Sequence, residues 1–193
     1  MIDRALDTIF VHCSASPRGR PDRAEDIERW HVERWGIAGK GSGYHAIVEL
    51  DGGVRWMRGP ERAGIHVGRW NPHSLGVCYI GGVEEDVFTP ADTRTPDQIK
   101  AIDEVCYTWL ERFGHLKIRG HNEVAARACP SYDVQADLRE RGFWEHRPIS
   151  ARLDPNDPRH LPRVGRSTLA GRAWRSVRRA LGLAPALERI GAR

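Results

Sequence analysis

The sequence lacks the features of membrane-inserted and secreted proteins. No apolar run approaches the roughly 20 residues that a membrane-spanning helix requires. Residues 1–7 contain no apolar segment of signal-peptide length, so we expect synthesis and folding in the cytoplasm. The chain also has no internal repeat and no low-complexity tract. These absences exclude a membrane span and a repeat architecture.

Cysteine is scarce, and its spacing excludes a disulfide-based scaffold. The four cysteines form no CxxC pair and are too sparse for a small secreted domain held by disulfides. Cys78 and Cys106 lie in apolar patterns and are expected to be small buried residues. Cys13 is next to His12 at the end of a predicted strand, and in extended chain neighbouring side chains point to opposite faces. Cys129 is therefore the one cysteine that we expect to bind a metal.

The charge is divided unevenly along the 193 residues, and this division suggests two parts. Ten arginines and three acidic residues follow position 147, a balance of +7, whereas the whole chain carries +4. Residues 1–147 therefore carry −3, and with seven tryptophans in the chain they are expected to form one folded domain. Residues 148–165 contain four prolines and are predicted to be a linker.

Residues 166–193 are predicted to form a basic, amphipathic C-terminal extension. A helical projection separates its apolar residues from its arginines. The apolar side contains Leu169, Ala173, Val177, Ala180, Leu181 and Ala184, and the opposite side contains Arg172, Arg175, Arg178 and Arg179. Such a helix fits an anionic membrane or envelope surface. Docking on the folded domain, a solvated helix and nucleic-acid binding remain alternatives, although only Trp174 offers a stacking surface for bases.

Hydrophobic patterns predict strands and helices in alternation. Residues 8–11 form an apolar run typical of a buried strand, and residues 22–35 show helical spacing of Ile27, Trp30, His31 and Trp35 before Gly36. Residues 46–50 and 54–57 flank Asp51-Gly52-Gly53, which predicts a hairpin. Residues 74–80 are apolar almost throughout, so this strand is expected in the centre of the sheet.

The second half of the domain continues this pattern. Thr95, Pro96 and Gln98 form a helix start, and the helix is predicted to extend to about Phe113. Residues 116–119 are predicted to be a short strand, and residues 134–143 a closing helix. The expected fold class is α/β, with a central mixed β-sheet flanked by helices and a C-terminal basic helical extension.

His12, His121 and Cys129 have the composition of a catalytic zinc site. His12 follows the first predicted strand, and a loop of seven residues separates His121 from Cys129. Two imidazoles and one thiolate leave the fourth tetrahedral position of zinc for water. A His₂Cys set also accepts copper or cobalt. Since the chain contains nine histidines, spacing alone does not establish the site.

A series of short motifs around these residues strengthens the assignment. They occur in the order Val11-His12-Cys13-Ser14-Ala15, Gly43-Tyr44-His45, Asn71-Pro72-His73-Ser74-Leu75-Gly76-Val77-Cys78, Gly81-Gly82, His121-Asn122-Glu123-Val124 and Ala128-Cys129-Pro130-Ser131-Tyr132-Asp133. Over residues 8–144 the series resembles the zinc-dependent N-acetylmuramoyl-L-alanine amidases, the superfamily of type 2 amidases and peptidoglycan-recognition proteins, and within it the short phage lysozymes. The resemblance implies an amidase fold with a mixed sheet and helices.

The resemblance also implies the roles of individual residues. His12, His121 and Cys129 would bind one zinc ion, and Tyr44 would be the catalytic tyrosine. Arg127 occupies a second catalytic position, where the phage lysozymes carry lysine. Arginine can stabilise an oxyanion or bind a carboxylate, but it cannot transfer a proton at neutral pH. His66 and Asn71 match the segment that lines the groove for the sugar and peptide.

The implied activity is hydrolysis of the amide bond between N-acetylmuramic acid and L-alanine in bacterial peptidoglycan. The protein would be a monomeric phage or prophage endolysin, made in the host cytoplasm and reaching peptidoglycan after membrane permeabilisation. One alternative is a peptidoglycan-binding protein without catalysis, for which an open zinc site would have no use. A second role, inhibition of a phage RNA polymerase, is also implied by the resemblance.

Overall fold

A five-stranded mixed sheet forms the centre of the computed structural model, which describes residues 4–36 and 42–146. The elements in chain order are β1 (Thr8–Cys13), β2 (Ser16–Pro17), α1 (Ala24–Trp35), β3 (Ala46–Val48), β4 (Val54–Trp56), the 3₁₀ helix η1 (Gly68–His73), β5 (Ser74–Tyr79), β6 (Gly82–Val83), α2 (Pro96–Phe113), β7 (Lys117–Gly120), the 3₁₀ helix η2 (His121–Glu123) and α3 (Val134–Glu140). The predicted linker and basic extension lie outside the described residues.

The strand order β4-β3-β5-β1-β7 confirms the mixed sheet. Strands β3, β5, β1 and β7 pair in parallel, and only the β3–β4 hairpin is antiparallel. The predicted strand at residues 74–80 is β5, which lies in the middle of the sheet and is buried throughout. Strands β2 and β6 form a separate two-stranded sheet.

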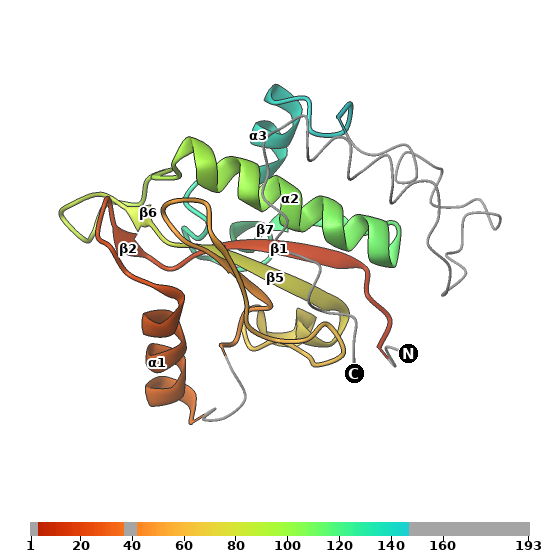
Figure 1. Ribbon diagram of the computed structural model, residues 1–193, viewed down its shortest axis with the longest axis horizontal. Helices are drawn as coiled ribbons and strands as arrows, with labels where there is room; N and C mark the ends of the chain where they lie inside the picture. Colours follow the sequence, from red (N-terminus) through yellow and green to blue (C-terminus); the bar gives the residue numbers. More distant parts are fainter. Residues whose placement is uncertain (1–3, 37–41, 147–193) are drawn as a thin grey trace.

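Helices cover both faces of this sheet, and Figure 1 shows α2 along one face and α1 on the other side. Alternate residues of β1 explain the two layers, because Ile9 and Val11 belong to the larger core with α2 and α3. On the opposite face, α1 packs through Ala24 and Ile27 against Ile47 of β3. None of the helices within the described ranges is both long and apolar enough to cross a membrane.

The strands and helices predicted within the described residues are present, and their boundaries agree with the structure to within two residues except at the end of α3. Strand β1 continues two residues beyond the predicted run, so His12 lies within it. Trp35 shares the helical spacing of the apolar residues but is 45% exposed, at the last position of α1 before Gly36, which has a left-handed conformation. The closing helix stops at Glu140, three residues early, because Gly142 has φ 60° and ends it.

Candidate metal-binding active site

Two parallel strands bring His12 and His121 together. In the pairing of β1 with β7, Val11 lies opposite Gly120, and the residue after each of these two in the chain is a histidine. Their rings are 4.8 Å apart between centroids. His12 is fully buried, and His121 is partly exposed. The site therefore lies at the carboxyl ends of parallel strands, where α/β proteins commonly bind ligands.

Cys129 completes a group of three potential metal ligands. One ligand atom from each of His12, His121 and Cys129 lies within 4.8 Å of the other two. The Cys129 Sγ atom is 3.6 Å from His12 Nδ1. Around a tetrahedral ion with bonds of about 2.05 Å to nitrogen and about 2.3 Å to sulfur, these two atoms would be about 3.6 Å apart. The separation of the His12 and Cys129 ligand atoms therefore fits a metal ion of the size of zinc.

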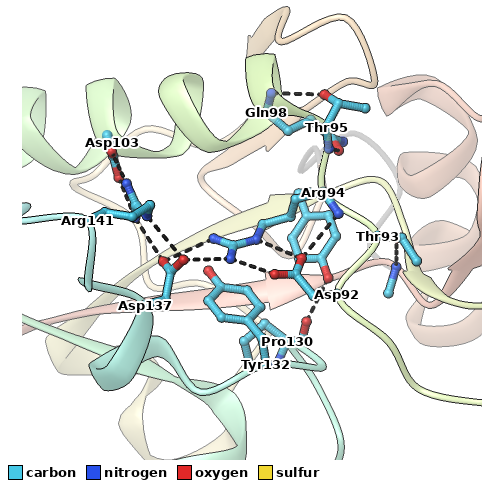
Figure 2. Close-up of polar contacts among 12 residues, drawn as sticks. Asp92, Thr93, Arg94, Thr95, Gln98, Asp103, Pro130, Tyr132, Asp137 and Arg141 are labelled. Atoms are coloured by element: carbon cyan, nitrogen blue, oxygen red, sulfur yellow. Dashed lines mark hydrogen bonds and ion pairs between the residues drawn. The ribbon is translucent and has the colours of Figure 1, made fainter. Parts of the chain in front are cut away.

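Contacts with several neighbouring segments hold the segment that carries Cys129. The Asn122 backbone N–H donates to the Cys129 carbonyl at 2.7 Å. The buried Tyr79 hydroxyl of β5 donates to the Pro130 carbonyl at 2.7 Å. Figure 2 shows the next attachment, where the Arg94 guanidinium lies 3.5 Å from the centre of the Tyr132 ring. These contacts fix the position of the sulfur.

Burial keeps both imidazoles in the neutral form that a metal requires. Burial, followed by the neighbouring His121, lowers the pKa of His12 well below its usual value. Burial and the positive charge of Arg127 lower the pKa of His121. The Cys13 thiol and burial raise the pKa of Cys129. A bound cation would therefore be needed to hold this sulfur as a thiolate.

Comparison with known proteins identifies the family to which this arrangement belongs. The family model described as N-acetylmuramoyl-L-alanine amidase matches residues 3–132, about two thirds of the chain. The chain belongs to the N-acetylmuramoyl-L-alanine amidase family. The endolysin of Escherichia phage T7 is 35% identical over 141 residues, which cover 73% of this chain and 87% of that protein. A peptidoglycan-recognition protein of Drosophila melanogaster, SC1a, is 27% identical over 124 residues, 62% of each chain.

Solved structures of low sequence identity share the fold of this amidase. The amidase LysC from Clostridium intestinale URNW has a TM-score of 0.59 at 19% identity, and the match covers 73% of this chain and 87% of that one. The Ph2119 endolysin from a Thermus scotoductus bacteriophage has a TM-score of 0.57 at 24% identity, with 72% and 85% covered. These matches confirm the predicted amidase-like architecture.

Tyr44 and Arg127, the two predicted catalytic residues of the amidase, lie beside the ligand group. The Tyr44 ring is 5.1 Å from the His12 ring between centroids, and burial raises the pKa of its hydroxyl well above the usual value. Tyr44 therefore keeps its proton and can donate a hydrogen bond. Arg127 is exposed, between His121 and Cys129 in the chain, and its charge acts on His121. Their catalytic roles stay predictions.

His66 and Asn71, the two predicted substrate-binding residues, make internal contacts in the amidase. His66 Nδ1 is 3.0 Å from His12 Nε2. The Asn71 Oδ1 atom accepts hydrogen bonds from the backbone N–H groups of His66 and Val67, at 3.0 and 2.9 Å. Their contact with substrate stays a prediction, whereas the structure shows that Asn71 holds the segment of His66 and that His66 contacts His12.

One group that supports the site, the ion pairs around Arg94, could not be predicted from the sequence. Arg94 is 2% exposed in its side chain and pairs with Asp92 at 2.7 Å and with Asp137 of α3 at 2.8 Å. Arg141 pairs with the same Asp137 and with Asp103 of α2 (Figure 2). Because Arg94 and Asp137 are 43 residues apart, neither spacing nor local composition could have indicated the pair. A charged residue just before the predicted helix cap resembles an ordinary surface arginine.

Proposed function

We propose that this amidase is an endolysin that binds one zinc ion through His12, His121 and Cys129 and hydrolyses the bond between N-acetylmuramic acid and L-alanine in peptidoglycan. The observation that carries the proposal is the three-residue ligand group, in which the separation of His12 Nδ1 and Cys129 Sγ equals that around a tetrahedral ion. Within the described residues the group contains three members, so a fourth coordination position would be open.

The chemistry of the proposed reaction is divided between the ion and two side chains. When bound, zinc supplies a water of lowered pKa and polarises the carbonyl oxygen of the scissile amide. Tyr44, which burial keeps protonated, donates a hydrogen bond to the oxygen that becomes negative. Arg127 keeps its positive charge at the exposed edge of the site and binds a carboxylate of the substrate or stabilises negative charge.

Peptidoglycan recognition without hydrolysis is the competing function, because relatives named peptidoglycan-recognition proteins match at 27% identity. The ligand group argues against it. A protein that only binds glycan has no use for two imidazoles and a cysteine arranged around an open metal position. The match to a phage endolysin is both longer and higher in identity, which supports hydrolysis at the end of infection.

The decisive experiment follows the release of peptide from purified peptidoglycan. Zinc-loaded wild type should release peptides with a free N-terminal L-alanine, identified by mass, and chelator should abolish the release. Cys129→Ala should be inactive, whereas Cys106→Ala, the same substitution in the core, should retain activity. Intact glycan binding by wild type with no new termini would favour the recognition function.

A further inference from the structure

The two ring nitrogens of His12 have different neighbours. Nδ1 faces the Cys129 sulfur at 3.6 Å, and Nε2 faces His66 Nδ1 at 3.0 Å. The rings of His12 and His66 are nearly perpendicular, with 4.9 Å between centroids. One side of the His12 imidazole therefore belongs to the ligand group, and the other side to His66.

This division decides where the His12 proton must be when a metal is bound. Nδ1 can offer its lone pair to an ion only if the proton is on Nε2. That N–H would then donate to His66 Nδ1, which accepts it only if the His66 proton is on its own Nε2. We propose that His66 is a positioning residue that selects the metal-binding tautomer of His12 through this hydrogen bond. The inference rests on the proposed metal site.

The surroundings of His66 support a fixed rather than a mobile ring. Asn71 Oδ1 holds its backbone N–H at 3.0 Å. Two glycines leave room for the ring, because a Cβ at Gly64 would lie 2.2 Å from the Cδ2 atom of His66, and a Cβ at Gly76 would lie 2.9 Å from three ring atoms. A side chain at either position would displace the imidazole from His12.

The remaining contacts of His66, and those of the nearby His45, support this role for His66. Among the described residues, His66 Nε2 is buried without a hydrogen-bond partner, so the contact with His12 is the polar contact that orients the ring. His45, another buried histidine whose ring lies 5.7 Å from that of His66 between centroids, is engaged elsewhere. Its Nδ1 accepts from the Gly76 N–H at 3.0 Å, and its Nε2 lies 3.0 Å from the Arg62 carbonyl. His45 therefore has no nitrogen left for His12.

Zinc affinity, measured by competition with a chromophoric chelator, separates positioning from substrate contact. His66→Phe keeps a ring but removes the acceptor, and affinity should fall about 10- to 100-fold, the usual effect of losing an outer partner of a metal ligand. His66→Asn keeps an acceptor near the position of Nδ1 and should retain affinity within about threefold of wild type. His73→Asn, which changes an exposed histidine outside the site, is the matched control.

A measurement on wild type tests the same inference without a substitution. Nitrogen-15 NMR of the zinc-loaded protein should show His12 bound through Nδ1 and protonated on Nε2. Coordination through Nε2, or equal zinc affinity in wild type and His66→Phe, would overturn the inference and leave His66 as a substrate contact. Failure of wild type itself to bind zinc would overturn the proposed function as well, so the two failures are distinguishable.

Discussion

Tyr44 combines a position beside the ligand group with a hydroxyl that stays protonated. Tyr44→Phe keeps the ring, which packs in the smaller core with α1, and removes only the donor. We expect the rate of amide hydrolysis to fall on the order of 10²–10³, because one donor to the developing oxyanion is lost. Hydrolysis of a soluble muramyl peptide measures this effect. Zinc affinity should be unchanged, and an active Tyr44→Phe enzyme would remove Tyr44 from the mechanism.

His45 should make the stability of the metal-free protein depend on pH. Burial lowers the pKa of His45 to about 4, below the value of about 6.5 in the unfolded chain. Between these two pH values the unfolded chain binds a proton that the folded protein does not, so the free energy of unfolding decreases as pH falls from 6.5 towards 4. One such group contributes up to about 1.4 kcal/mol per pH unit in this window.

Urea unfolding in chelator at several pH values between 7.5 and 4.5 isolates this contribution. His45→Asn retains an acceptor for the Gly76 N–H and should give a shallower dependence on pH than wild type. His73→Asn should leave the slope unchanged. If wild type and His45→Asn show the same slope, the buried imidazole of His45 is not the group that titrates.

At the residue scale, the sequence motifs indicated which side chains belong to the candidate site. They did not indicate which of these side chains contact one another. His12, His121 and Cys129 were chosen from their local context, and the structure brings their ligand atoms together. The contact of His66 with His12 spans 54 residues, and its geometry depends on the register of separate strands and loops. Motif position suggested the substrate groove for His66, because a sequence does not reveal which way a ring points.

At the scale of elements, the Arg94 group joins α2, α3 and the Cys129 segment. Arg94→Met should lower the free energy of unfolding by about 3 kcal/mol, because it removes one partner of a buried ion pair and leaves Asp137 with less compensation. It also removes the guanidinium from the Tyr132 ring. Equilibrium denaturation with urea measures the change.

An exposed ion pair provides the control for this effect. Arg18 pairs with Glu84 at 2.7 Å, and both side chains are well exposed. Arg18→Met should therefore change the free energy of unfolding far less than Arg94→Met, because solvent screens an exposed pair. Similar costs for the two substitutions would contradict the view that burial gives the Arg94 pair its importance.

A helix boundary could be predicted where a few neighbouring residues determine it. The start of α2 was recognisable because Thr95 and Gln98 cap each other across one turn, as the structure confirms. The end of α3 was misplaced because apolar spacing continues to Phe143, although Gly142 ends the helix earlier. Phe143 nevertheless remains buried, stacked on Tyr107 of α2. The apolar spacing therefore predicted the burial of Phe143 correctly, although Phe143 lies beyond the end of α3.

At the scale of the whole molecule, the basic extension provides a test of the division into domain and tail. Deleting residues 160–193 removes eight of the ten arginines beyond position 147. We expect weaker binding to vesicles containing anionic lipid, because the amphipathic arginine-rich segment is lost, and unchanged hydrolysis of a soluble muramyl peptide. Vesicle co-sedimentation measures the binding, with neutral vesicles as the control. Equal sedimentation of both proteins would contradict the expectation that the extension binds an anionic membrane.

Metal binding should stabilise the whole domain, because the proposed ligands lie on separate parts of the chain. His12 is on β1, His121 follows β7, and Cys129 lies in the loop before α3. An ion that binds only the folded state adds about 4 kcal/mol of stability at a free concentration 1,000 times its dissociation constant. Wild type should therefore melt several degrees higher with zinc than with chelator, as differential scanning calorimetry would show.

Two cysteine substitutions separate this linkage from a general effect of zinc. Cys129→Ala removes a ligand and should abolish most of the increase in melting temperature. Cys106→Ala creates a small cavity in the core and should melt lower than wild type, yet retain the full increase on adding zinc. An equal increase in both variants would mean that zinc stabilises the protein from another place. The increase in melting temperature of Cys106→Ala on adding zinc is thus the control. If it equals that of wild type while Cys129→Ala shows little increase, the metal connects the three segments that carry the ligands.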